Sequence, residues 1–134
     1  MGSRGVVTCN GCFDGLHRGH LFFLGYCAAH GDELIVGINT DRYMREVKGV
    51  EPMFAEEDRK RMLLETGVVK EVRVFSEDIP NEFIKRVRPR VHCTGELDGA
   101  NCPEAAVCAE VGVELVLVPR VGDWSSTQMR GDRL

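Results

Sequence analysis

Two histidines in a glycine-rich stretch have the residue type and spacing that best suit chemistry in this chain of 134 residues. His17 and His20 stand three residues apart, and on the first turn of a helix such residues lie on one face. The N-terminus of a helix presents unpaired N–H groups and a partial positive charge, which together attract anions. Two imidazoles placed there could stabilise charge that develops on a phosphoryl group.

The residues around this pair favour a phosphate-binding turn. Gly11 and Gly15 allow the backbone to turn tightly and to approach a ligand, and Gly19 leaves room between the imidazoles. The whole stretch reads Asn10-Gly11-Cys12-Phe13-Asp14-Gly15-Leu16-His17-Arg18-Gly19-His20. Two other interpretations remain open. The histidines could merely cap a helix, or they could bind zinc, although no third and fourth ligand stands nearby.

A turn of this kind needs a strand before it and a helix after it, and the hydrophobic pattern predicts both. Strands are predicted over residues 5–9, 33–39, 72–75, 91–94 and 114–118, and helices over 21–30, 41–47, 55–65, 81–87 and 103–111, with a last short helix capped by Ser125 or Ser126. The alternation indicates βαβ units with right-handed crossovers. We therefore expect one Rossmann-like α/β domain over residues 1–134, with three α/β/α layers and a parallel sheet of about five strands. Ligands bind such sheets beyond the carboxyl ends of the strands.

Composition narrows the classes of partner. The formal net charge of −4 argues against a nucleic-acid binder, which usually carries a basic face. No apolar run is long enough to span a membrane, and the first residues do not read as a signal peptide, so we expect a cytoplasmic protein that does not contact a membrane. The six cysteines are expected to be free thiols, as is usual in that compartment.

The string Gly-Cys-Phe-Asp-Gly-Leu-His-Arg-Gly-His, residues 11–20, resembles the signature of the HxGH nucleotidyltransferases. The resemblance covers the chain from Val6 to about Met129 and is greatest to the cytidylyltransferase-type branch. That branch includes glycerol-3-phosphate cytidylyltransferase and the nucleotidyltransferase domain of the bifunctional ADP-heptose synthase. The resemblance implies transfer of a nucleoside monophosphate from an NTP to a phosphorylated sugar or polyol, with release of pyrophosphate. It also implies Mg²⁺ on the triphosphate, and homodimers are common in the branch.

The resemblance also assigns roles to residues of the first loop. His17 and His20 would contact the NTP phosphates and stabilise the transition state while the acceptor phosphate attacks the α-phosphorus directly. The nucleotide-binding turn would comprise Asn10, Gly11, Cys12, Phe13, Asp14 and Gly19.

The same resemblance also assigns phosphate-binding roles to lysine and arginine residues outside the first loop. Lys48, in Val47-Lys48-Gly49, occupies the position of a phosphate-binding lysine, and Arg59 matches the arginine of the family's Glu-x-x-Arg helix, where it would hold an acceptor or nucleotide phosphate. Near the end of the chain, Arg120 matches the arginine of a cytidylyltransferase motif. The hydroxyls of that motif correspond to Ser125, Ser126 and Thr127 and would hold the triphosphate.

The base and the acceptor remain open. Gly95 matches a loop that helps to hold the base, but Glu96 and Leu97 replace the residues that usually follow it. The overall pattern favours ADP-heptose synthase and therefore ATP, whereas Arg120 favours CTP. Two functions of other classes also stay open. One is a non-catalytic nucleotide-binding module, and the other is a thiol redox or zinc protein based on Cys9-Asn10-Gly11-Cys12.

Overall fold

The computed structural model describes residues 5–76, 81–95 and 104–119, and Arg120, Ser125, Ser126 and Thr127 lie outside the described residues. The strands are β1 (Val6–Gly11), β2 (Glu33–Asn39), β3 (Glu71–Phe75), β4 (Val91–Gly95) and β5 (Glu114–Val118). The helices are α1 (Arg18–Ala28), α2 (Asp41–Glu46), α3 (Glu56–Glu65), α4 (Asn81–Val87) and α6 (Glu104–Val111).

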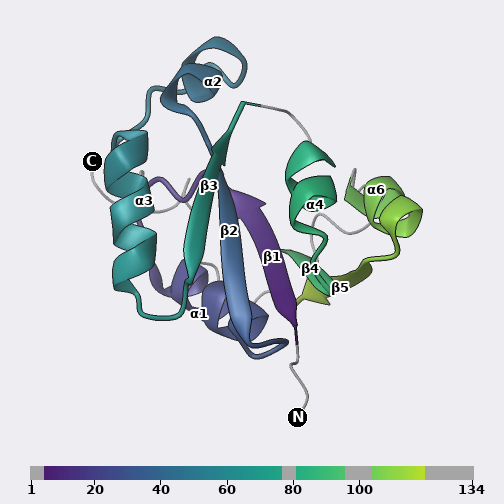
Figure 1. Ribbon diagram of the computed structural model, residues 1–134. Coiled ribbons are helices and arrows are strands. Elements are labelled where there is room, and N and C mark those ends of the chain that lie inside the picture. The colour runs from purple at the N-terminus through teal and green to yellow at the C-terminus, as the bar shows by residue number, and fades with distance from the viewer. Residues whose placement is uncertain (1–4, 77–80, 96–103, 120–134) are drawn as a thin grey trace.

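The five strands form one parallel sheet in the order β3-β2-β1-β4-β5. Figure 1 shows α1 behind this sheet and α4 and α6 in front of it, with α2 beyond the upper ends of the strands. The predicted Rossmann-like α/β fold is therefore confirmed.

Two apolar cores separate the layers. Leu24 and Cys27 of α1 and Leu63 of α3 pack against one face of the sheet, and Phe83 of α4 and Val107 of α6 pack against the other. The strands carry apolar residues on both faces, as expected for a parallel sheet buried on both sides. At Gly37 of β2 the absence of a side chain is required, because an added Cβ would lie 2.8 Å from the Phe75 ring and 3.0 Å from the Phe83 ring.

The strand order reverses at β1, which lies between β2 and β4. β1 pairs with β2 along its whole length, from Val6 to Gly11, but with β4 only at Val7 and Thr8. Beyond Thr8 the carboxyl-terminal halves of β1 and β4 are not paired with each other. Such a reversal point opens a crevice at the carboxyl edge of the sheet, where ligands bind in folds of this class.

Within the described residues the predicted elements agree with the observed ones except at some ends, and the predicted last short helix lies outside those residues. The clearest difference is α1, which begins at Arg18 rather than at Leu21, so that both histidines belong to its first turn. β1 also continues through Asn10 to Gly11. None of the helices in the described ranges is long and apolar enough to cross a membrane.

Candidate active site

A cavity of about 290 Å³ lies where β1 and β4 diverge. Its lining combines the end of β1 and the following turn with α1 and the end of β4: Asn10, Gly11, Cys12, Phe13, His20, Phe23, Thr94 and Gly95. The volume is close to the lower end of the ~300–1,000 Å³ found for small-molecule sites. Six of the eight residues were predicted to contribute to the site from the sequence.

The turn after β1 has a strained backbone. Phe13 has a φ of +49°, which residues with side chains rarely adopt, and Gly15 has a φ of +97°. The Phe13 ring is buried against the backbone of Gly11, where an added Cβ would lie 3.1 Å from the ring. Strain of this kind persists only where the surroundings hold it, and it is concentrated at functional sites.

The two histidines cap the N-terminus of α1 reciprocally. The Nδ1 atom of His17 accepts the backbone N–H of His20 at 3.3 Å, and the Nδ1 atom of His20 accepts the backbone N–H of His17 at 3.4 Å. The two rings stack with their centroids 3.8 Å apart. An imidazole that accepts through Nδ1 carries its proton on Nε2 when neutral. The cap therefore assigns the Nε2–H tautomer to both rings.

Burial keeps these imidazoles uncharged at neutral pH. It lowers the pKa of His17, and together with the neighbouring His17 it lowers the pKa of His20 to about 4, against the opposing effect of the Gly15 carbonyl. The Nε2 atom of His17 is enclosed and has no hydrogen-bond partner in the described part of the chain. A buried N–H without a partner is costly, so a phosphate oxygen that accepted from it would remove that cost.

Lys48 lies at the rim of the cavity. It follows α2, and the φ of +67° at Gly49 turns the chain immediately after it. Its ammonium donates to the Cys12 thiol at 3.3 Å and lies 6.0 Å from the centroid of the Tyr43 ring. Because Cys12 lines the cavity, the fold brings the Lys48 charge beside the first loop from 36 residues away.

Asp14 faces away from this cavity, although it lies in the same turn. Its carboxylate accepts the backbone N–H of Met53 at 2.7 Å and that of Phe54 at 2.9 Å, and it is 1% exposed. A carboxylate that accepts two backbone N–H groups is a strong tie between segments. Asp14 therefore ties the turn after β1 to the loop before α3.

The guanidinium of Arg59 is completely buried. It donates to the carbonyls of Cys12 and Phe54 and forms an ion pair with Asp41 at 2.8 Å. Burial raises the pKa of Asp41, but the hydrogen bonds from Arg59 and the Glu56 backbone outweigh it and leave the pKa lowered. The predicted binding of an acceptor or nucleotide phosphate by Arg59 is therefore not supported, because a ligand cannot reach its guanidinium.

Two residues of the lining were not predicted. Phe23 stands three residues after His20, so helical spacing places both on one face of α1 and could have indicated it. Thr94 directly precedes the predicted Gly95. His92, near the start of β4, does not line the cavity: it is completely buried, and its Nδ1 atom lies 2.7 Å from the Thr8 hydroxyl.

The cysteines of the described segments are all free thiols: Cys9, Cys12, Cys27, Cys93 and Cys108. Cys9 is buried in the core beneath α1, whereas Cys12 is half-buried at the cavity. No group of three or more His, Cys, Asp or Glu residues that could hold a metal ion occurs within the ranges that the structure describes. This part of the chain gives the zinc interpretation no support.

Comparison with known proteins adds relatives of defined function. The model of the cytidylyltransferase-like family matches residues 8–111. The chain is 37% identical to a D-beta-D-heptose 1-phosphate adenylyltransferase from Bordetella bronchiseptica, over 96% of this chain and 81% of that protein. It is 38% identical to the bifunctional protein HldE of Koribacter versatilis, but it spans only 26% of that relative's length against 92% of its own.

Solved structures share the architecture. A lipopolysaccharide core biosynthesis protein from Thermoplasma volcanium superposes with a TM-score of 0.73 at 26% identity, over 92% of this chain and all of that one. A pantothenate synthetase from Thermus thermophilus superposes with a TM-score of 0.66 at 17% identity, over 93% of this chain and 61% of that one, which shows a common fold alone.

Proposed function

This chain belongs to the cytidylyltransferase-like family of nucleotidyltransferases, and from that membership we propose that it transfers AMP from ATP to the phosphate of a heptose 1-phosphate and releases pyrophosphate. The single observation that carries the proposal is the stacked pair of His17 and His20 at the N-terminus of α1, beside the cavity. The choice of ATP and of this acceptor rests on the name of the Bordetella relative.

In the proposed reaction, the acceptor phosphate displaces pyrophosphate directly. An oxygen of the acceptor phosphate attacks the α-phosphorus of ATP, the bond from that phosphorus to the bridging oxygen breaks, and pyrophosphate leaves with the electron pair. The acceptor oxygen is already anionic, so no general base is required. The Nε2–H group of His17 donates to the phosphate oxygens that gain charge, the imidazole of His20 contacts them by family resemblance, and Lys48 neutralises charge at the rim. By family resemblance, Arg120 neutralises phosphate charge together with Lys48, and Ser125, Ser126 and Thr127 hold the triphosphate tail.

Mg²⁺ is proposed to enter with ATP as part of the substrate. Mg²⁺ commonly binds through phosphate oxygens and water, with few protein ligands. The described residues fit this arrangement, because they form no acidic or histidine cage that would hold the ion by itself. We also propose a homodimer, as is common in this branch, and light scattering would test it. A reaction that consumes ATP and a sugar phosphate belongs in the cytoplasm.

The test is pyrophosphate release with Mg²⁺, measured for ATP, CTP, UTP and GTP against a panel of sugar and polyol phosphates. We expect release only with ATP and a heptose phosphate together, and a loss of about 10² to 10³ in kcat for His17→Ala and for His20→Ala. His30→Ala is the matched control, because His30 lies beyond the other end of α1 and is hydrogen-bonded to the Tyr26 carbonyl.

Two outcomes would redirect the assignment. Release that is fastest with CTP would overturn the choice of ATP and favour the cytidylyltransferases. Nucleotide binding without release from any pair would favour the non-catalytic module.

A further inference from the structure

Arg59 joins three segments that are distant in the sequence. From α3 its Nε atom donates to the Phe54 carbonyl at 3.0 Å, Nη1 donates to the Cys12 carbonyl at 2.9 Å, and Nη2 donates to Asp41 at 2.8 Å. Phe54 belongs to the loop before α3, Cys12 to the first loop, and Asp41 to the start of α2. One buried guanidinium therefore fixes the relative positions of all three segments.

Asp14 makes a second connection between the same parts. Its carboxylate accepts the N–H groups of Met53 and Phe54, so Phe54 is held through its N–H by Asp14 and through its carbonyl by Arg59. At the other end of the segment, Asp41 and Glu56 each accept the other's backbone N–H, at 3.1 and 2.8 Å. The segment 41–54 is thus fastened at both ends.

Lys48 lies in the middle of this segment and is exposed. Its contacts to the rest of the site are the 3.3 Å contact with the Cys12 thiol and the more distant Tyr43 ring. The position of its ammonium therefore depends on where the segment 41–54 is fastened. A displacement of about 1 Å at a charge that meets a reacting phosphate can cost about 10²-fold in rate.

We propose that Arg59 and Asp14 are positioning residues for the nucleotidyltransfer, which fix the segment 41–54 against the first loop so that Lys48 meets the triphosphate. The inference rests on the proposed function. It replaces direct phosphate binding by Arg59, since every donor direction described above ends on the protein itself.

A double-mutant cycle tests whether Arg59 acts through Lys48. Arg59→Lys keeps the charge but loses the planar fork that reaches three partners at once. We expect it to lower kcat about 10-fold or more with little change in the KM for the acceptor, and to lower kcat less than about 3-fold when Lys48 is already alanine. The proposal would be overturned if the fold-losses in kcat of the two single variants multiplied in the double variant. It would also be overturned if Arg59→Lys raised the KM for the acceptor and left kcat unchanged.

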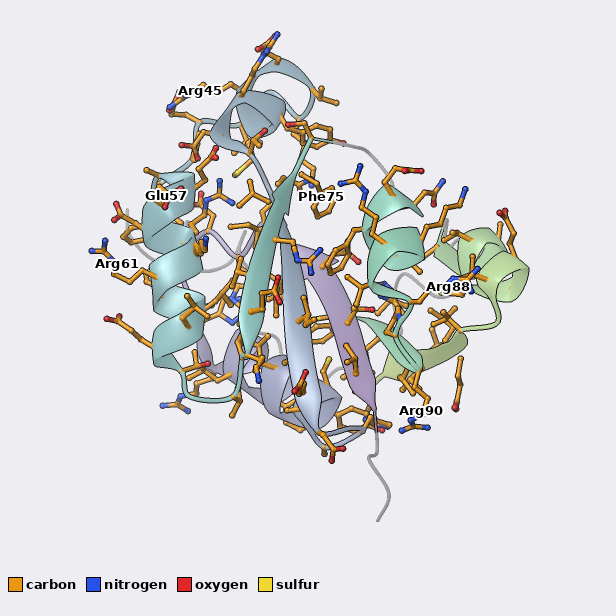
Figure 2. All side chains as sticks on the ribbon, viewed as in Figure 1. Arg45, Glu57, Arg61, Phe75, Arg88 and Arg90 are labelled. Atoms are coloured by element: carbon orange, nitrogen blue, oxygen red, sulfur yellow. The ribbon has the colours of Figure 1, made fainter. Side chains whose placement is uncertain are left out.

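Two further variants protect the test against misfolding. Arg59→Lys leaves buried carbonyls of Cys12 and Phe54 without their donor, which is destabilising, so a loss of activity in this variant alone does not separate positioning from unfolding. Asp14→Asn retains the size of the side chain but weakens its double acceptance, and it should show the same dependence on Lys48. Arg61→Lys is the matched control, because Arg61 projects into solvent from the same helix (Figure 2) and should change neither constant.

The same double-mutant cycle, with nucleotide affinity measured in place of kcat, separates this inference from the proposed function. Calorimetry with a non-hydrolysable ATP analogue reports the contribution of Lys48 to affinity without turnover. A wild-type protein that binds the analogue but releases no pyrophosphate would contradict the proposed function alone. In that case, the positioning role is still supported if the double variant loses less binding free energy than the sum of the losses in Lys48→Ala and Arg59→Lys. A loss in the double variant equal to that sum overturns the positioning role.

Discussion

A pair of neutral histidines makes the N-terminus of α1 depend on pH. Each ring caps the helix through a lone pair on Nδ1, and protonation of that atom removes the acceptor. The burial that lowers both pKa values therefore also protects the cap in mildly acidic solution. It follows that the tautomer needed to donate to phosphate and the integrity of the helix end are controlled by the same proton.

The stability of the protein should fall as the pH drops from about 6.5 to about 4. Burial lowers the pKa of His92 from 6.5 to about 4, against the opposing effect of Glu104, and the pKa of His20 lies at a similar value. Between these limits the unfolded chain binds protons that the folded chain does not, so the free energy of unfolding decreases. Urea midpoints across this range measure the slope.

His92→Gln should make that slope shallower, because glutamine does not titrate. Val68→Ala is a suitable control, because Val68 is exposed and its side chain carries no titratable group. Midpoints that stay constant between pH 6.5 and 4 in the wild-type protein would contradict the depressed histidine pKa values.

At the scale of the element, one residue of the α1 N-terminus has a structural role and is also proposed to have a catalytic one. His17 is the N-cap of the helix, yet Ser, Thr, Asn and Asp are the residues that usually stabilise this position. The presence of histidine there is thus better explained by phosphate chemistry than by helix stability.

The two roles of His17 should be separable by substitution. In His17→Asn the side-chain oxygen can still accept the His20 N–H, so the free energy of unfolding should change by less than about 0.5 kcal/mol, whereas His17→Ala should lose about 1 kcal/mol. Both variants should lose about 10² to 10³ in kcat. Chemical denaturation and pyrophosphate release measure the two effects, and retained activity in His17→Asn would contradict the proposed role of the imidazole.

The sequence predicts elements better than it predicts contacts. The apolar run of β2 and the helical run of α4 have the predicted ends, because burial dictates their pattern. The start of α1 was placed three residues late, since histidine is not a usual capping residue. The partners of Arg59 could not be predicted, because the Cys12 carbonyl lies 47 residues away and every residue type has a backbone carbonyl that could accept.

At the scale of the whole molecule, the thiols fall into two environments. Hydrogen bonding to Cys9 and burial raise the pKa of Cys27, and hydrogen bonding to Cys27 and burial raise that of Cys93. These three thiols lie together in the core between α1 and the sheet. Since all three are buried away from solvent, they should be inert in the folded protein.

Native alkylation should distinguish the two environments. Iodoacetamide should modify Cys12 about 100-fold or more faster than Cys9, Cys27, Cys93 and Cys108, which react only when the structure opens. ATP should slow the reaction at Cys12, because this thiol lines the cavity. Peptide mass spectrometry resolves each site. Equal rates at all five thiols, or no protection by ATP, would contradict the described site.

The short pairing between β1 and β4 has a mechanical consequence. In the described sheet, β1 and β4 are register partners at Val7 and Thr8 alone, whereas the cavity takes Asn10 and Gly11 from β1 and Thr94 and Gly95 from β4. A bound nucleotide would therefore contact both strands at the point where they are not paired with each other. Amide hydrogen exchange should slow throughout β5 on ATP binding, although no residue of β5 lines the cavity, because the sheet would then open only as one unit.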